Sequence, residues 1–514
     1  MQKTTRLIVA LNVIILLMIA FYFFLAPALL IIKNLRDPAI RDGRVSQMAW
    51  ELHRAITPGL GKWARERVES RVAANLDLYD VPSTEWPIFG SVFYLMATEN
   101  LQKEWEANNG SGGSAPDAPK VYSRSSLDAA IDLVMDPVHH TWVKTHWGTN
   151  YLHRENVFFR SLLIAAATSY ENLTGIRKYR SVLEDQCLTL ANDLDASKYG
   201  VLDDYPGECY PIDVFFAVMM IDKAGRLAGI DQSDFVMRSI RAFEGPMLDK
   251  LGLPPYSISS VTGKPEMMSE PTMGISMESS SRGIGNSYVL IFAGDVWPDI
   301  AKKWYSSYEK HFWQDLWWAS GFREFPNDPI YMNWGFDVDA GPILGGFSPA
   351  ANAYAMPAAI VNGRLDHSFT LLSECIAASW PLPSGRLMGP ALLSDQRHAP
   401  YLGEANLLWL LSYSKQPNVD IVSGGKITFY VYFIIALHLL AFLLVAYGCV
   451  KKLQYILIAG YAVVVWPKIQ TCIWVLLILA SAGFTYLGNS GVGAIFVLLA
   501  QLLPICLINL CYKD

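Results

Sequence analysis

The sequence predicts an all-α protein, a toroid of helical hairpins of the (α/α)6 barrel type, with membrane-spanning helices at both ends of the chain. Apolar residues recur at helical spacing through the middle, whereas the period-two alternation that is typical of strands is scarce. This middle part has about 390 residues, enough for about twelve helices at roughly 30 residues each. With 52% hydrophobic residues, the chain is too apolar for an ordinary soluble protein. An irregular α-solenoid is the alternative fold.

The first predicted element is a transmembrane anchor within residues 1–33. Residues 7–32 form an uncharged apolar run that is long enough to cross a bilayer with some tilt. A secretory signal has a shorter apolar core and a cleavage site of small residues, so we expect this anchor to be retained. Lys3 and Arg6 precede the run and favour a cytoplasmic N-terminus, whereas four basic residues just after it favour the opposite orientation.

The predicted middle domain covers residues 34–425. Its connecting segments are rich in Pro, Gly, Asp and Trp, a composition that is typical of loops. In an (α/α)6 barrel, the ends of the inner helices and their loops face a central pocket, where we expect the functional site. Helical spacing of apolar residues is clearest in residues 157–170, 214–227, 288–312 and 350–360.

The last predicted element is a transmembrane region within residues 426–514. Its apolar stretches are residues 427–450, 453–466, 469–487 and 492–511, of which the second is short, so we expect about three to four spans. If Lys451 and Lys452 are cytoplasmic, the middle domain lies on the other side of the membrane. We therefore expect a multi-pass protein of the bacterial inner membrane, with the lipid bilayer as a partner and a periplasmic main domain.

Charge and cysteine content exclude several classes of function. A net charge of −6 gives no reason to expect nucleic acid as a partner. None of the seven cysteines forms a C-x-x-C motif, and the histidines of residues 139–153 do not have the spacing of a zinc motif. The G-x-G in SRGIGNSYVL (residues 281–290) is not completed as a dinucleotide fingerprint. We therefore expect neither a metal nor a cofactor.

Polar residues are concentrated in four loops and before one predicted helix. The loops lie near residues 77–86, 139–156, 203–214 and 322–342. The candidate catalytic residues are Asp203, Asp204, Glu208, Cys209, Asp337 and Asp339. The candidate substrate-binding residues are Tyr79, Trp86, His153, Glu155, Asn156, Tyr205, Tyr210, Arg282, Asn286 and Trp334.

The acidic loops favour acid/base chemistry, which needs two ionisable groups whose environments set their pKa values apart. The segment DDYPGECYPIDV (residues 203–214) supplies one carboxyl group, and Asp337 or Asp339 supplies the other. The alternative is that these acids cap the helices that follow, as Asp213 and Asp339 are placed to do. Cys209 is either a packing residue or a neutral thiol that donates protons, because acidic neighbours raise a thiol pKa.

Three segments resemble the linalool dehydratase/isomerase family, in the same order. They are HRENVFFRSLLIAAATSYENLTGIRKY, GVLDDYPGECYPIDVFFAV and DVDAGPILGGFSPAANAYAMPAAIVNGRLD, and the resemblance covers residues 145–370. It implies an (α/α)6 barrel that assembles as a ring-like homo-oligomer in the periplasm. It also implies the addition or removal of water at a tertiary allylic alcohol, with isomerisation, and without a cofactor.

The resemblance assigns some residues of the site and leaves others unmatched. Glu155 and Asn156 match the Glu-Asn pair before an inner helix, and Cys209 matches the second of the family's two site cysteines. Leu202 or its neighbour stands where the first cysteine is expected, and Leu162 where the family has its histidine. The D-x-D-x-G turn of the family is matched by Asp337, Asp339 and Gly341.

Three functions are consistent with these observations. The first is a membrane-anchored enzyme that dehydrates or isomerises a small, hydroxylated and partly apolar substrate by acid/base chemistry. The second is a glycan-active hydrolase or lyase at the cell envelope, because paired carboxyl groups and many aromatic residues also suit a glycan. The third is a membrane scaffold that binds a glycan or lipid without catalysis. The spacing of the carboxyl groups distinguishes the second function from the first.

Overall fold

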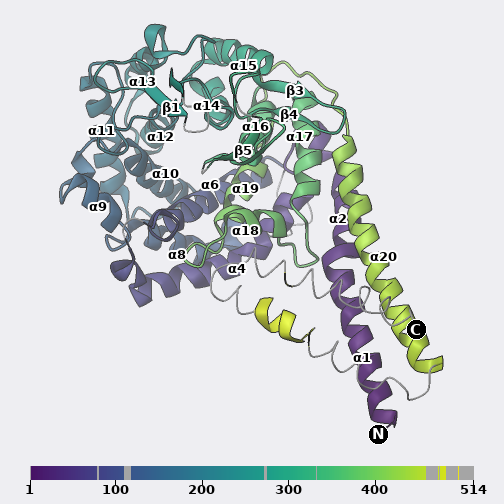
Figure 1. Cartoon of the computed structure of the whole chain (residues 1–514). Coiled ribbons are helices and arrows are strands. Elements are labelled where there is room, and N and C mark those ends of the chain that lie inside the picture. The colour runs from purple at the N-terminus through teal and green to yellow at the C-terminus, as the bar shows by residue number, and fades with distance from the viewer. Residues whose placement is uncertain are drawn as a thin grey trace.

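The computed structural model describes residues 2–77, 80–108, 117–270, 275–331, 333–337 and 339–458, together with 473, 475–481 and 496. Over these residues the chain is mostly helical, with three short antiparallel strand pairs, so the predicted helical class is confirmed. A body of packed helices carries a projecting helical pair at one side (Figure 1).

Six helices form the centre of the body. Each of them contacts the next, and the last contacts the first, so that the contacts close a cycle (Figure 1). Apart from their first turns they are largely buried, which explains why their sequences are apolar on all sides. In order around the cycle they are α6 (Trp86–Ala107), α10 (Val157–Thr174), α12 (Pro211–Ala228), α14 (Gly283–Val296), α16 (Pro349–Val361) and α19 (Leu402–Leu411).

More amphipathic helices pack outside this cycle. In α15, for example, Trp304 and Tyr308 are buried, while Lys302 and Lys303 are exposed to solvent. The outer helices are α4 (Gln47–Ser70), α8 (Arg124–Met135), α11 (Arg180–Ala196), α13 (Ser233–Ser239), α15 (Pro298–Phe312) and α17 (Leu365–Ala378). The short helices are α3 (Ala39–Asp42), α5 (Val81–Thr84), α7 (Pro119–Tyr122), α9 (Thr141–Trp147) and α18 (Met388–Ser394).

Aromatic rings from different helices fill the space between the central helices. Trp409 of α19 stacks on Phe93 of α6, with ring centroids 5.1 Å apart. It also lies against Tyr288 and Phe292 of α14, and Phe216 of α12 contacts the same two rings. Burial of these large rings joins helices that are far apart in sequence, and such pairs add stability beyond the buried area.

The strands occur as three separate pairs. The pairs are β1 (Met267–Glu270) with β2 (Ile275–Glu278), β3 (Trp313–Asp315) with β4 (Ser320–Phe322), and β5 (Trp334–Asp337) with β6 (Gly341–Leu344). In the last pair, Trp334 is opposite Leu344 and Phe336 is opposite Pro342. Most of this hairpin lies within residues 322–342, which the sequence predicts as a loop. The predicted continuous helical stretch 288–312 is interrupted, because Pro298 starts α15 after Trp297 ends α14.

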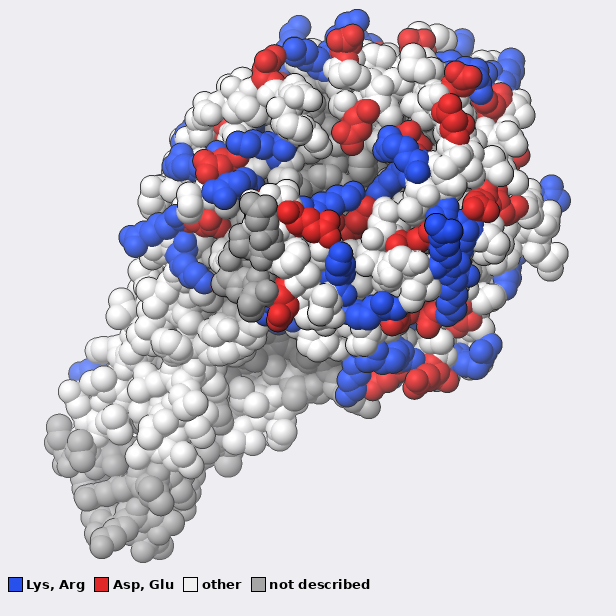
Figure 2. All heavy atoms as spheres, turned by 180° about the vertical axis from the view of Figure 1, so that it is seen from behind, with Lys and Arg blue, Asp and Glu red and all other residues white. Residues whose placement is uncertain are grey.

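Two helical segments project together from the body. They are α1 (Gln2–Ala20), which continues through a π-helical turn (Phe21–Leu25) into α2 (Ala26–Leu35), and α20 (Phe429–Ile458) (Figure 1). Ala10–Leu35 and Phe429–Lys451 are both long and apolar enough to cross a membrane, as predicted. In Figure 2, charged side chains cover the body, whereas the described part of the projecting pair is nearly free of them.

The C-terminal spans are described only in part. Helix α20 continues without a break through Lys451 and Lys452 to Ile458, although residues 453–466 were predicted as a separate stretch. The rest of that stretch, and most of residues 469–487 and 492–511, lie outside the described residues.

A side chain of the body completes the backbone hydrogen bonding of the first span. At the π-helical turn, the Ala26 N–H donates to the Phe21 carbonyl, and Pro27 has no N–H to donate to the carbonyl of Phe23. The indole N–H of Trp380, which follows α17, donates to the Phe23 oxygen over 2.8 Å. Trp380 has a φ of 51°, in the left-handed region that side chains other than glycine rarely adopt. This contact fastens the body to the projecting pair.

Candidate acid/base site

Positions near the N-terminal ends of the six central helices are only partly buried. They include Phe89, Phe158, Asp213, Gly285, Tyr354 and Asn406. Hydrogen bonds link the segments before α6, α10 and α12, and others link the segments before α14 and α16. We call this end of the six helices the mouth.

The acidic loop of residues 203–209 closes the N-terminal end of α10. The Phe158 N–H donates to Asp204 Oδ1 over 2.8 Å, and the Val157 N–H donates to the Asp203 carbonyl over 3.2 Å. The loop is itself held by a hydrogen bond from the Asp204 N–H to the Glu208 carbonyl, over 2.8 Å. Asp204 therefore caps an earlier helix, and its carboxyl group is fixed in a buried position at the mouth.

Asp204 forms a carboxyl pair with Asp213, which lies in the first turn of α12. The two side chains are hydrogen-bonded to each other, which requires that one of them carries a proton. Burial raises the pKa of Asp204 well above its usual range, and the charge of Asp213 adds to this effect. Burial also raises the pKa of Asp213, to about 7. Asp204 Oδ1 accepts the Phe158 N–H, whereas Asp204 Oδ2 receives no hydrogen bond from a donor group among the described residues.

Two tyrosines of the central helices are within electrostatic range of Asp213. Burial raises the pKa values of Tyr288 and Tyr354, and the charge of Asp213 makes a smaller contribution to both shifts. The Tyr354 hydroxyl donates to Asn406 Oδ1 over 3.3 Å, and its ring is 5.4 Å from that of Tyr288. The pair thus stands between a polar loop and an apolar, aromatic interior.

A second acid of the mouth is Glu85, which precedes α6. Tyr205 donates its hydroxyl hydrogen to Glu85 Oε1 over 2.7 Å and thereby ties the acidic loop to α6. Burial raises the pKa of Glu85 to about 7, although the hydrogen bond from Tyr205 acts in the opposite direction. Charges on Glu85, Asp204 and Asp213 all act on the Tyr205 hydroxyl, which places this tyrosine between the two sets of acids.

Cys209 is buried beneath the same loop. Burial raises the pKa of its thiol well above the usual value, and the neighbouring Asp204, Asp203 and Asp213 add to the effect. The thiol is therefore neutral at physiological pH, in the direction expected from its acidic neighbours.

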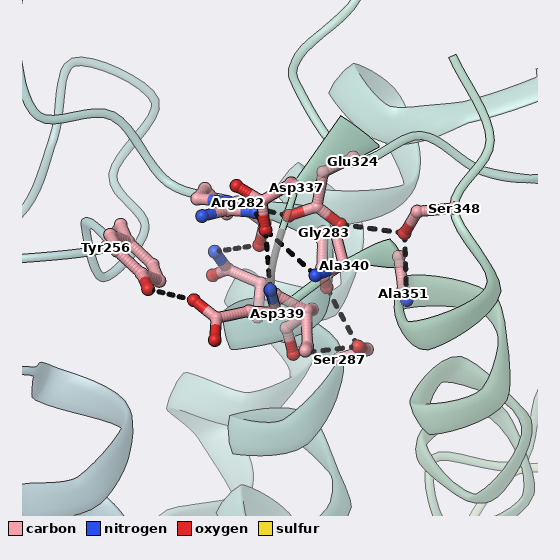
Figure 3. Close-up of polar contacts among 12 residues, drawn as sticks. Tyr256, Arg282, Gly283, Ser287, Glu324, Asp337, Asp339, Ala340, Ser348 and Ala351 are labelled. Atoms are coloured by element: carbon pink, nitrogen blue, oxygen red, sulfur yellow. Dashed lines mark hydrogen bonds and ion pairs between the residues drawn. The ribbon is translucent and has the colours of Figure 1, made fainter. Parts of the chain in front are cut away.

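Arg282 organises the acids that precede α14 and α16 (Figure 3). Its guanidinium group donates to Glu324 over 2.7 Å and pairs with Asp337 over 2.8 Å. Glu324 in turn accepts a hydrogen bond from Ser348, the N-cap of α16. Burial opposes ionisation of Asp337, but the charge of Arg282 outweighs it and lowers the pKa of this carboxyl group. Asp337 is thus held as a paired anion, which suits positioning better than proton transfer.

The remaining acids of the two loops bind tyrosines. Tyr256 donates its hydroxyl hydrogen to Asp339 (Figure 3), and Tyr210 donates to Glu208 over 2.9 Å. The Tyr210 and Tyr256 rings lie 5.4 Å apart. A small pocket beside them is lined by Ile212, Pro254, Pro255, Tyr256, Arg282, Gly285 and Val289. The free volume of this pocket is about 10 Å³, room for no more than one water molecule, so it is too small in this structure for an organic substrate.

Other predicted site residues lie around this arrangement. Glu155 is exposed and accepts a hydrogen bond from the Asp203 N–H over 2.8 Å. Asn156 is buried with a φ of 40°, and its side-chain nitrogen has no partner among the described residues. Asn286 donates to two backbone carbonyls, which is a structural role. His153 and Trp334 are exposed, Trp86 starts α6 as a half-buried residue, and Tyr79 lies outside the described residues.

The sequence left open the alternative that Asp213 and Asp339 cap the helices that follow them. Neither is the cap of a following helix: Tyr210 is the N-cap of α12, and the segment after Asp339 is strand β6. Glu85 belongs to the polar loop of residues 77–86, and Asp213 belongs to the acidic segment of residues 203–214. No spacing in the sequence marks either residue as a member of a cluster of acids.

Over the described part of the chain, no group of three or more His, Cys, Asp and Glu side chains is placed to hold a metal ion. Comparison of the chain with protein-family models and with curated proteins gives no match.

Proposed function

We propose that this protein is a membrane-anchored acid/base catalyst that dehydrates or isomerises a hydroxylated, partly apolar substrate without a cofactor. The observation that carries the proposal is the buried Asp204–Asp213 pair at the mouth of the six central helices. The proposal includes the (α/α)6 barrel class, for which the closed cycle of six helices is the support. It also includes the resemblance to the linalool dehydratase/isomerase family, which rests on the sequence motifs alone.

The pair has the two protonation states that such a reaction needs. Protonated Asp204 donates its proton to the substrate hydroxyl group, the C–O bond breaks and water leaves. Ionised Asp213 takes a proton from the adjacent carbon, and the electrons of that C–H bond form the new double bond. The proton then returns from Asp213 to Asp204 across their hydrogen bond, which restores the starting pair. Because both carboxyl groups lie side by side, water and the proton leave from the same face of the substrate.

The geometry favours this reaction over the glycan-active alternative. Glycosidases hold their two carboxyl groups about 5 Å apart when they retain configuration, and about 6.5 to 9.5 Å apart when they invert it. Asp204 and Asp213 are in hydrogen-bond contact, which is closer than either spacing. Tyr288 and Tyr354 are within electrostatic range of Asp213, and the apolar interior to which they belong suits a hydrocarbon chain.

The proposal places the main domain outside the cytoplasm of a bacterial cell, as a part of the inner membrane. Lys3 and Arg6 precede the apolar part of α1, and Lys451 and Lys452 lie near the end of α20. In Figure 1 these two ends lie together, at the far end of the projecting pair from the body. Both basic clusters are then cytoplasmic, as the positive-inside rule favours.

The test is turnover of a panel of partly apolar allylic alcohols by the full-length protein in detergent, with the products of water loss measured by gas chromatography. Asp204→Asn and Asp213→Asn should each reduce the rate by about 10²-fold or more, because each removes one partner of the proton transfer. Asp231→Asn, an exposed change after α12, is the matched control and should retain the wild-type rate. A substrate deuterated on one face should lose the label together with water from that same face.

Other outcomes would remove the proposal. An equal loss in Glu208→Gln, with full activity in Asp213→Asn, would place the proton donor in the exposed part of the loop. Hydrolysis of an oligosaccharide in place of dehydration would favour the glycan-active function. Binding of alcohols or glycans without turnover would favour the scaffold.

A further inference from the structure

Exposed aromatic and aliphatic side chains extend from the start of α20 to the β5–β6 hairpin beside the mouth. We call this set the apolar band. Its members are Trp317, Trp334, Phe336, Leu344, Phe429 and Phe433. Large contiguous apolar patches on a protein surface mark contacts with a partner or with lipid.

At one end, the band begins on the membrane-spanning helix. Trp317 is 81% exposed in the β3–β4 turn, and its ring centroid is 5.4 Å from that of Phe429, the first residue of α20. Phe429 stacks on Phe433, one turn further along the span, and both side chains are half exposed. The Tyr430 N–H donates to the Trp318 carbonyl over 2.8 Å, so the turn is fixed to the helix.

At the other end, the band is one face of the β5–β6 hairpin. Cross-strand pairing places Trp334 beside Leu344, and Phe336, two residues further along, points to the same side. These side chains are 69%, 52% and 74% exposed, respectively. On the opposite face of the hairpin, Ile343 is fully buried against Phe325 and Tyr331.

The two ends are joined by contacts between the strand pairs. Gln314 of β3 donates its side-chain N–H to the Gly345 carbonyl over 2.7 Å, directly after β6. The Trp318 ring packs beside Gly345 and lies 5.7 Å from the ring of Phe347. The hairpin and the Trp317 turn therefore form one surface, continuous with the span.

We propose that the apolar band lies on the outer surface of the lipid bilayer, so that the body touches the membrane beside its anchors. The occupant is lipid because the band continues the apolar side of α20, and because Trp and Phe are favoured at the boundary between headgroups and acyl chains. Asp337 ends β5 and pairs with Arg282 at the mouth, so this contact holds the mouth at the membrane surface. The lipid contact does not depend on the proposed function. The inference that substrate enters the mouth from the bilayer does rest on the proposed function.

The test uses the full-length protein in phosphatidylcholine nanodiscs that hold one copy each. Tryptophan emission is measured for wild-type protein, Trp317→Phe and Trp334→Phe, with and without lipid carrying a nitroxide near the headgroup. The difference between wild-type and variant isolates the emission of each tryptophan. Nitroxide lipid should reduce the emission of both by at least twofold. Trp147 in α9, at the side of the body opposite the projecting pair in Figure 1, should be unaffected when measured through Trp147→Phe.

Two results would overturn the proposal. Quenching of Trp317 and Trp334 by acrylamide in water, with no effect of nitroxide lipid, would show that the band faces solvent. Protection from both quenchers that appears only in discs holding two copies would assign the band to a contact between subunits. Trp317 and Trp334 are exposed, so loss of folding in these two variants does not confuse the result, and no outcome depends on catalytic activity.

Discussion

From the Asp204–Asp213 pair we predict an unusual dependence of stability on pH, which Asp213→Asn should weaken. Between the ordinary carboxyl pKa of 3.8 and the raised value of about 7, the native state binds a proton at Asp213 that the unfolded state has released. The free energy of unfolding therefore falls as pH rises through this window. The asparagine side chain does not titrate, so the variant loses the contribution of Asp213 and keeps that of the buried Asp204.

The magnitude follows from the size of the shift. Roughly three pH units at 1.36 kcal/mol each give an upper limit of about 4 kcal/mol. Asp213 is partly exposed and shares its proton with Asp204, so we expect about 2 kcal/mol, of the order of a typical destabilising mutation. Between pH 5 and pH 8, wild-type protein should lose this much more stability than the variant.

The assay is urea unfolding of the full-length protein in detergent, followed by tryptophan emission at several pH values. Asp299→Asn removes an exposed carboxyl group in the first turn of α15 and should keep the wild-type pH profile. The reasoning is refuted if Asp213→Asn and wild-type protein lose equal stability between pH 5 and pH 8.

Two further predictions concern the packing of the body. Gly283→Ala should destabilise the protein by several kcal/mol, since a Cβ at this position would lie 2.1 Å from the Arg323 carbonyl oxygen. Gly294→Ala has open space around it and should be neutral or stabilising by up to about 1 kcal/mol. Equal urea midpoints for the two variants would contradict this prediction. Trp380→Phe should cost about 1 kcal/mol, because the partly buried Phe23 carbonyl loses its donor, and it should make the junction between the body and α1 more accessible to protease. An unchanged cleavage rate and urea midpoint would show that the contact contributes little.

The sequence was sufficient for the helical class, because helices that are buried on most sides leave long apolar stretches. The break between α14 and α15 was not predicted, although Pro298, which cannot continue the backbone hydrogen bonding of the preceding helix, marks it. The β5–β6 hairpin was not predicted either. Its strands have four residues each and contain Gly335 and Gly341, so they lack the long alternating pattern that predicts a strand.

The candidate site was predictable only where its residues are close together in the sequence. Asp204 and Cys209 stand in a motif dense in carboxyl groups, and this local signal pointed to the loop that lies at the mouth. The pairing of Asp204 with Asp213 depends on how α10 and α12 approach each other, which no spacing in the sequence records. Glu85 and Tyr205 are 120 positions apart, and their hydrogen bond likewise exists only in the folded chain.

The contact between Trp380 and Phe23 also sets an order of assembly. The first span leaves the ribosome more than 350 residues before the side chain that completes its hydrogen bonding. Until α17 and the following segment have folded against it, the Phe23 carbonyl near Pro27 lacks its partner, and the helix can bend there. The Phe23 carbonyl therefore gains its side-chain donor only after the body has folded, so the first helix to be made is completed by a segment made much later.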